Sequence, residues 1–233
     1  MIWMRPERPA RGPQPSHSRD EIAAAAVAIA DAEGIEAVSM RRVAAAIGAG
    51  TMSLYRYVPK KEDLFDLMID AVGGEYDLPT EPSGDPRADL TGLAHQGRAL
   101  MRRHRWLPTL LAVRQPLGPN TLRYAEFVLA ALAGTDLDGT TKMETIGLLN
   151  GLVIGMVQWE SAQAEASRRA GVTPAEWAAA QVAYLRHVAG SGKYPRFAAV
   201  LAEGGARPDS DALFARALNR FLDGILPAVD RSL

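Results

Sequence analysis

The chain has 233 residues, of which 48% are hydrophobic and 23% charged, and its formal net charge is −1. This composition supports a packed core and argues against a disordered chain. The lack of cysteine excludes disulfides, thiolate zinc sites and cysteine nucleophiles, and the longest uncharged run is too short to span a bilayer, so we expect a cytoplasmic protein.

The N-terminal region begins with residues 1–17, which carry four prolines and three arginines. They are predicted to form a flexible basic arm, or a leader without a role of its own. Ser18 and Glu21 have the spacing of a capping box, which predicts the start of a helix at this point. Apolar residues then recur at helical spacing until Gly34, which is expected to end the helix.

Three further short helices are predicted before residue 76. Ser39 is expected to cap the second helix, and Gly48 to stop it. A third helix is predicted over residues 51–57, because Pro59 prevents it from continuing. A fourth is predicted over residues 61–75, with acidic residues in its first turn, where they suit the helix dipole.

The remainder of the chain again has helical periodicity, interrupted by proline and glycine. A linker is expected at residues 77–86. No run of alternating β-branched residues predicts a strand, so the expected fold class is all-α, with a small helical head and a larger helical body. The body helices are expected at residues 87–104, 106–113, 121–133, 139–167, 174–189, 195–203 and 210–226.

The two glycines at positions 48 and 50 suggest either a phosphate-binding loop or a tight turn between helices. A dinucleotide-binding loop needs a third glycine and a preceding strand, but Ser53 occupies the third position and an amphipathic helix precedes the loop. A helix-turn-helix needs a small residue where the helices cross and apolar residues that lock them. Ala44 and Gly48 are expected to let the helices meet, and the lock to consist of Val43, Ile47 and Leu54.

The exposed face of the third helix is expected to be mostly polar, with two aromatic residues. Such a face suits phosphate and base-edge contacts in a DNA major groove, although an ordinary helical hairpin can also expose polar residues. Residues 1–61 hold nine basic and six acidic residues, whereas the remainder of the chain has a net charge of −4. Cations flank the third helix on both sides, where phosphates would lie: Arg41, Arg42, Arg56, Lys60 and Lys61.

Two sets of spaced residues resemble those of a known family. The head carries Ala32-Glu33-Gly34, Ser39, Arg41, Val43, Ala44, Ile47 and Gly48, then Ser53-Leu54-Tyr55-Arg56-Tyr57-Val58 and Lys60-Lys61-Glu62-Asp63-Leu64. The body carries His104-Arg105-Trp106-Leu107-Pro108, a long helix after Leu137, and Tyr194-Pro195-Arg196-Phe197. The first set resembles the DNA-binding domain of the TetR family of transcriptional repressors, and the second resembles its tetracycline-repressor-like C-terminal domain.

The resemblance implies a domain organisation and a set of DNA contacts. After the arm, residues 18–62 would form a homeodomain-like helix-turn-helix domain, and residues 63–233 a helical ligand-binding and dimerisation domain. The expected partner is a palindromic operator in double-stranded DNA. Ala49 replaces a larger aliphatic residue usual in the family, so the turn would be looser. The implied DNA-binding residues are Ser39, Arg41, Thr51, Met52, Ser53, Tyr55, Arg56, Tyr57, Lys60 and Lys61.

Small residues recur at every fourth position along the long helix of the body. Each glycine costs a helix interior about 1 kcal/mol, so several on one face suggest that another backbone packs closely there. The close neighbour is either part of the same chain or a second copy. The resemblance implies a homodimer built as a four-helix bundle, for which we expect Gly147, Gly151, Gly155, Leu218, Phe221 and Leu222 as interface residues.

The body also carries aromatic and polar residues that could line a pocket for a small-molecule inducer of unknown identity, or simply form the core. The resemblance implies that such a ligand moves the helix at residues 61–75 and so changes the spacing of two DNA-binding heads. No cofactor and no metal are expected. The candidate ligand-binding residues are Met101, His104, Trp106, Leu110, Tyr124, Phe127, Asn150, Gln158, Trp159 and Trp177.

The chain lacks the signatures of several enzyme classes. The patterns Glu-x-x-His, His-Glu-x-x-His, Gly-x-Ser-x-Gly and Ser-x-x-Lys are all absent. The sequence therefore favours a DNA-binding transcriptional regulator that is not an enzyme, released from its operator by a ligand. The alternatives are an architectural or constitutive DNA-binding protein without an inducer, and a helical enzyme with scattered catalytic residues.

Overall fold

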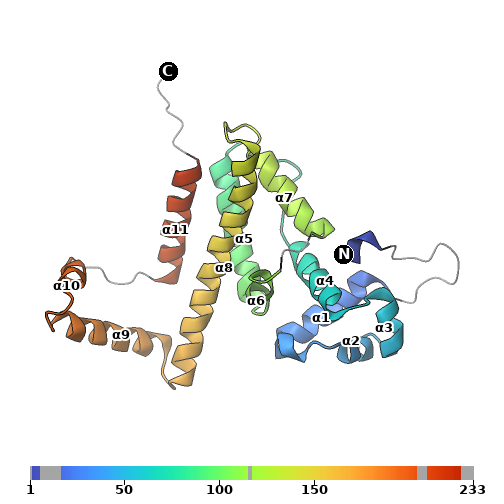
Figure 1. Cartoon of the computed structure of the whole chain (residues 1–233), viewed down its shortest axis with the longest axis horizontal. Helices are drawn as coiled ribbons and strands as arrows, with labels where there is room; N and C mark the ends of the chain where they lie inside the picture. The colour runs from blue at the N-terminus through green and yellow to red at the C-terminus, as the bar shows by residue number, and fades with distance from the viewer. Residues whose placement is uncertain (1, 6–16, 115–116, 204–208, 227–233) are drawn as a thin grey trace. The chain divides into compact units, whose positions relative to one another are not determined.

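The computed structural model describes residues 2–5, 17–114, 117–203 and 209–226 (Figure 1). These residues form eleven α-helices and two 3-10 turns, with no strand among them, which confirms the all-α expectation. The chain divides into two compact units, Met1–Ile154 and Gly155–Leu233, and the division lies inside the long helix α8 (Gly139–Arg169). The predicted domain boundary between residues 62 and 63 lies inside the first unit. The division into a DNA-binding domain and a ligand-binding domain at this point therefore stays a prediction.

The first residues of the chain pack against the first unit. The 3-10 turn η1 (Ile2–Met4) has Ile2 with no exposed surface. A Cβ atom added to Gly118 would lie 2.6 Å from Cζ2 of Trp3, so the indole lies against the start of α7 (Pro119–Ala131). Residues 2–4 therefore do not form part of the flexible arm that was predicted, because the side chains of Ile2 and Trp3 pack against other residues. Residues 6–16 of that predicted arm lie outside the described residues.

Local signals in the sequence set the ends of α1 (Arg19–Glu33). The hydroxyl of Ser18 accepts a hydrogen bond from the backbone N–H of Glu21 at 3.0 Å, as predicted. The carboxylate of Glu21 lies 3.1 Å from Nδ1 of His17, so only half of the expected capping box is formed. Gly34 ends the helix with φ at +90° and leads into the 3-10 turn η2 (Ile35–Ala37).

A glycine-capped turn joins α2 (Met40–Ala46) to α3 (Thr51–Tyr57). The backbone N–H of Ala49 donates to the carbonyl of Ala44 at 2.8 Å, and Gly48 has φ at +69°. This is the left-handed helix cap that favours glycine. Among the residues that the structure describes, a Cβ at Gly48 would meet no atom within 4 Å. The glycine is therefore required by its backbone conformation and not, as predicted, by lack of space between the helices.

Replacing Gly48 by alanine is expected to destabilise the chain by about 1 to 2 kcal/mol, the cost of a left-handed L-residue. The matched control is Gly92→Ala, because Gly92 is an exposed glycine inside a helix with open space around its Cα atom. There alanine should stabilise the chain by up to about 1 kcal/mol. Urea unfolding of the two variants should therefore shift the midpoint in opposite directions, and a shift of the same sign would contradict this explanation.

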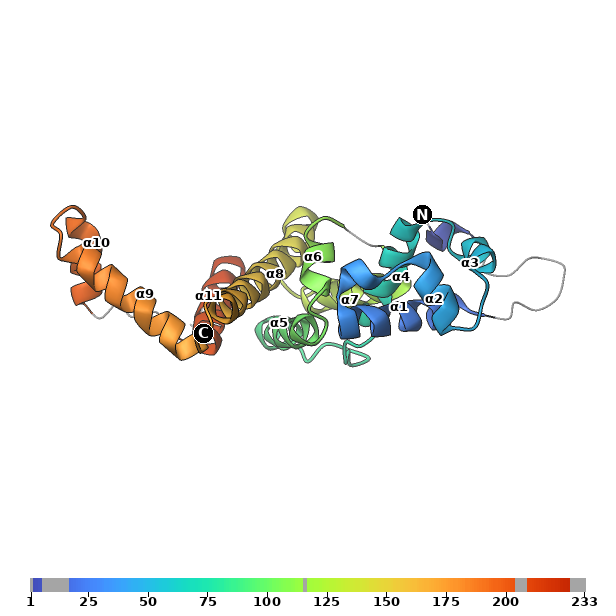
Figure 2. The ribbon, with the colours of Figure 1, turned by 90° about the horizontal axis from the view of Figure 1, so that it is seen from below.

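The helix α4 (Lys61–Gly73) lies beside α1 and α7 (Figures 1 and 2). The carboxylate of Asp70, on α4, is buried at 4% exposure and accepts hydrogen bonds from the backbone N–H groups of Asn120 and Thr121, at 3.0 and 2.9 Å. These N–H groups belong to the first turn of α7, where a helix has no internal acceptors. A side chain of α4 thus caps another helix, which fixes the spacing of α4 and α7.

Three helices and part of a fourth complete the first unit. Asp85 caps α5 (Pro86–Arg103) by accepting from the backbone N–H groups of Arg87 and Ala88. The short helix α6 (Leu107–Leu111) follows, then α7 and the first half of α8. The fully buried apolar residues here include Leu90, Val128, Leu132 and Leu149.

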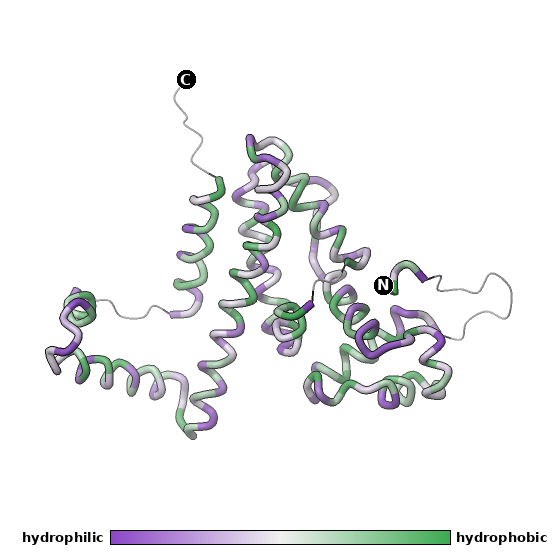
Figure 3. The backbone as a smooth tube through the Cα atoms, viewed as in Figure 1, coloured by the Kyte–Doolittle hydropathy of each residue, from purple (hydrophilic) through white to green (hydrophobic). Residues whose placement is uncertain are grey.

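The second unit consists of the end of α8, α9 (Pro174–Ala189), α10 (Pro195–Ala202) and α11 (Ser210–Ile225). Thr173 and Glu176 form the predicted capping box, with both reciprocal hydrogen bonds present. Hydrophobic and hydrophilic residues alternate along α8 and α9 (Figure 3). Neither α9 nor α10 has a buried residue. None of the described helices is long and apolar enough to cross a membrane.

Candidate nucleic-acid interface and ligand site

The helix α3 has one buried edge and one exposed face. Leu54 and Val58 have no exposed surface and anchor the helix and its C-terminal cap to the head. On the opposite side, 80% of Met52 and 42% of Tyr55 are exposed. An exposed methionine and tyrosine in a helix of seven residues add nothing to the core, so this face is available to a partner. Arg41, Arg56, Lys60 and Lys61 are also exposed, and Ser39, Thr51, Ser53 and Tyr57 are half-buried.

Neighbouring cations around α3 have different surroundings. Arg42 donates to both carboxylate oxygens of Glu33, with Nη1 2.9 Å from Oε2, and this pairing lowers the pKa of Glu33 below its ordinary value. Within the part of the chain that the structure describes, Arg41, Arg56 and Lys60 make no ion pair or side-chain hydrogen bond. Arg42, predicted as one of the flanking cations, is therefore held by an acidic neighbour, whereas the other three remain available to phosphate.

A cluster of tyrosines lies between α5, α7 and α8. The rings of Tyr76 and Tyr124 are 4.9 Å apart at an angle of 46°, and the hydroxyl of Tyr124 donates to Oδ1 of Asn150 at 2.9 Å. Burial raises the pKa of Tyr76 to about 12 and also raises the pKa of Tyr124. A Cβ at Gly97 would lie 2.6 Å from the hydroxyl of Tyr76, so the glycine makes room for this ring.

The tyrosine cluster has unused polar groups. Among the described residues, the hydroxyl of Tyr76 and the amide NH₂ of Asn150 make no hydrogen bond. Met101 lies one turn from Gly97 on α5, and Phe127 one turn from Tyr124 on α7; both are buried. Aromatic and apolar surface with a few free polar groups is typical of ligand sites. Sequence reasoning missed Tyr76, which follows α4 in a segment predicted only as its end and a linker.

The structure does not bring all predicted ligand residues to this cluster. His104 and Trp106 both make hydrogen bonds to Asp31 on α1, so the prediction that they face a ligand is corrected. Their polar atoms already contact Asp31, and Nε2 of His104 contacts Glu75. Leu110 is buried on α6. The remaining three belong to the second unit: Gln158, Trp159 and Trp177, whose indole N–H donates to Gln163.

The predicted dimer residues divide into two groups. Gly147, Gly151 and Gly155 are exposed, and a Cβ atom at any of them would meet no atom of the described part of the chain within 4 Å. Close packing within the chain therefore does not explain these glycines. In contrast, Leu218 and Leu222 have at most 1% exposure, so they serve packing within the chain and are removed from the predicted interface. Phe221 is partly exposed.

Comparisons with known proteins match both the N-terminal helices and the helical body. Residues 22–68 match the family described as bacterial regulatory proteins, tetR family, and residues 78–229 match the tetracyclin repressor-like C-terminal domain. The chain is 43% identical over 226 residues to the HTH-type transcriptional repressor DrrR1 of Streptomyces coeruleorubidus, covering 97% of this chain and 83% of that protein.

Solved structures give the same result. The apo structure of ActR from Streptomyces coelicolor has a TM-score of 0.77 at 28% identity and covers 92% of this chain and 97% of its own. The structure of ActR in complex with actinorhodin has a TM-score of 0.75 at 28% identity, covering 90% and 97%. The similarity therefore extends over both the DNA-binding head and the helical body.

Proposed function

The chain belongs to the TetR family of bacterial transcriptional regulators, and we propose that it acts as a homodimer that a planar aromatic ligand releases from a palindromic operator. Its class is that of a DNA-binding repressor that responds to a ligand. Because a repressor acts where the chromosomal DNA lies, we place the chain in the cytoplasm.

The proposed DNA-reading surface is the exposed face of α3 with the cations around it. Met52 and Tyr55 would reach base edges, where a thioether suits contact with a thymine methyl group. Arg41, Arg56, Lys60 and Lys61 would hold phosphates on both sides of the groove. The observation that carries this proposal is the 80% exposure of Met52 on a short helix whose other side is locked into the core.

The proposed ligand site is the tyrosine cluster of Tyr76, Tyr124 and Asn150. Two tyrosine rings at 4.9 Å offer aromatic surface, and the free hydroxyl and amide groups can bind ligand hydroxyl or carbonyl groups. The similarity to ActR, whose structure contains actinorhodin, supports an aromatic ligand of this kind. The predicted ligand contacts Gln158 and Trp159 lie in the second unit and are not part of this proposed site.

The experiment begins with selection of bound duplexes from random DNA by the full chain. We expect one palindrome, and uniform recovery would favour an architectural protein. Actinorhodin is then the probe of release from that palindrome. Tyr124→Ala should raise the concentration needed for release at least about tenfold, since a buried aromatic contact and a hydrogen bond are lost.

The matched control is Tyr184→Ala, because Tyr184 is 66% exposed on α9 and belongs to the second unit. Actinorhodin should release this variant from the palindrome at the same concentration as it releases the unchanged chain. A palindrome that actinorhodin never releases, together with no binding of actinorhodin to the free chain, would contradict the aromatic ligand while leaving the DNA-binding function intact.

A further inference from the structure

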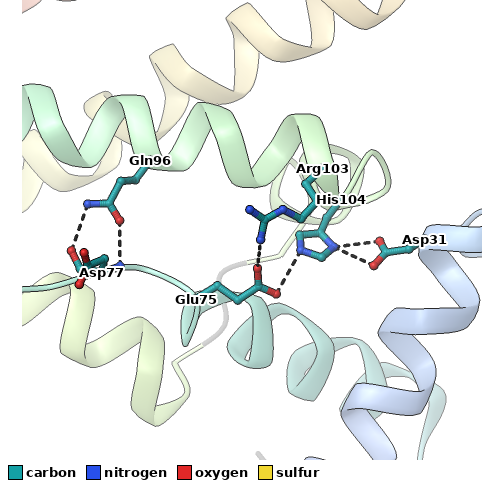
Figure 4. A network of polar contacts seen from close by, with 6 residues as sticks. All are labelled: Asp31, Glu75, Asp77, Gln96, Arg103 and His104. Atoms are coloured by element: carbon teal, nitrogen blue, oxygen red, sulfur yellow. Dashed lines mark hydrogen bonds and ion pairs between the residues drawn. The ribbon is translucent and has the colours of Figure 1, made fainter.

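One histidine connects three segments of the first unit. His104, at the end of α5, is 4% exposed, and its Nδ1 lies 2.8 and 3.0 Å from the two carboxylate oxygens of Asp31 on α1. Its Nε2 lies 3.1 Å from Oε1 of Glu75, which follows α4 (Figure 4). The ring thus joins the first helix of the DNA-binding head, the end of α4 and the body.

The donors and acceptors around this ring are matched. Both ring nitrogens face carboxylates, so an N–H group at either nitrogen has an acceptor within hydrogen-bond distance. The indole N–H of Trp106 also donates to Asp31, at 2.7 Å, and Nη1 of Arg103 donates to Glu75, at 2.7 Å. Three residues within one four-residue stretch of the body, Arg103, His104 and Trp106, therefore supply all of these donors. Hydrogen bonds to carboxylates are charge-assisted and are among the stronger ones in proteins, and the imidazole between these two carboxylates is buried.

The backbone of the two residues that follow Glu75 is also held by hydrogen bonds. Gln96 on α5 accepts from the N–H of Asp77 at 2.8 Å and donates to its carbonyl at 3.1 Å (Figure 4). Arg123 on α7 donates to the carbonyl of Tyr76 at 3.2 Å. Tyr76 belongs to the proposed ligand site and is the next residue after Glu75. A ligand that shifted Tyr76 against these contacts would therefore also shift the adjacent Glu75, whose carboxylate lies against His104.

We propose that His104 is a positioning residue that locks α1 and the end of α4 to the body, and that a ligand beside Tyr76 opens this lock through Glu75. The ligand step rests on the proposed function, whereas the lock is a property of the chain without ligand. The lock fixes the orientation of each DNA-binding head, and so it sets the distance between the two half-sites that a dimer can bind.

Hydrogen exchange of the full chain without ligand or DNA tests the lock directly. His104→Ala is expected to speed exchange of the amides at residues 26–33 of α1 about tenfold, the effect of losing one charge-assisted hydrogen bond. The matched control is His187→Ala, since His187 is exposed on α9, and it should change nothing at α1. Asp31→Ala should have the same effect as His104→Ala, and the double variant should add little to either.

Two near-isosteric variants separate the lock from a merely structural role. The amide of His104→Asn can replace Nδ1 and should restore protection of α1 but not the contact to Glu75. The amide of His104→Gln can replace Nε2 and should do the reverse. Unchanged exchange at α1 in both His104→Ala and Asp31→Ala would overturn the proposal, and so would equal exchange in the Asn and Gln variants.

The palindrome recovered by selection gives a second readout. The ratio of the affinity for the native half-site spacing to the affinity for a spacing longer by about two base pairs measures the spacing preference. In His104→Ala this ratio should fall at least about tenfold, since a freed head can bind both spacings. If selection yields no palindrome, the proposed function fails while the exchange result still decides the lock. If a palindrome is found and the spacing preference is unchanged in His104→Ala, the lock does not set the head spacing and the proposal is overturned.

Discussion

Arg41→Ala is expected to weaken binding to the operator about tenfold, whereas the neighbouring variant Arg42→Ala is expected to change it less than about threefold. Arg41 is exposed and makes no ion pair among the described residues, so its guanidinium is available to a phosphate. Arg42 already donates to Glu33. A lost phosphate contact should weaken binding to all duplexes alike and lower the slope of log affinity against log salt by about one.

The measurement is a titration of labelled operator at several salt concentrations with both variants. The two arginines are adjacent on one short helix, so a difference between them reports on their contacts and not on the helix. Equal losses would mean that Arg42 leaves Glu33 when DNA binds. A loss for Arg41→Ala confined to one operator sequence would instead assign it to base reading.

The ends of the helices could be predicted from the sequence because their signals are local. Ser18, Ser39 and Thr173 cap helices in the positions expected, and α3 and α9 have the predicted bounds. A cap needs a side chain to reach only two or three residues along the chain, so spacing in the sequence determines it. The exposed face of α3, which we propose reads DNA, followed from the same signals, since α3 is short and Leu54 fixes its buried side.

The polar contacts between distant segments could not be predicted in this way. His104 and Trp106 were assigned to a ligand site because aromatic residues often line pockets, yet their partner Asp31 lies more than seventy positions earlier. The sequence does not predict the role of Asp70, because the N–H groups that it accepts from, in the first turn of α7, lie about fifty positions later in the chain. The sequence predicts Gly48 as a turn residue. Glycine is required there by a positive backbone φ angle and not by a close approach of the helices, which only the three-dimensional structure shows.

The exposed glycines of α8 permit a sharper test of the dimer. Gly151→Leu is expected to convert a dimer into a 25.0 kDa monomer and to weaken operator binding by more than about a hundredfold, since a lone head loses the gain from binding two linked half-sites. A Cβ atom added to Gly151 would meet no atom of the described residues within 4 Å. The substituted chain should therefore fold as before, while a second backbone could no longer approach.

The helix propensity of the substituted residue separates this result from unfolding. Leucine in place of an interior glycine should favour the helical state by up to about 1 kcal/mol, so α8 should become more stable as the dimer is lost. Gly92→Leu is the matched control, because Gly92 is also exposed, helical and surrounded by open space, on α5. It should keep both the dimer and the operator affinity. Sedimentation would contradict the proposed interface if Gly151→Leu stayed dimeric, and in that case Gly147, Gly151 and Gly155 would need another close neighbour.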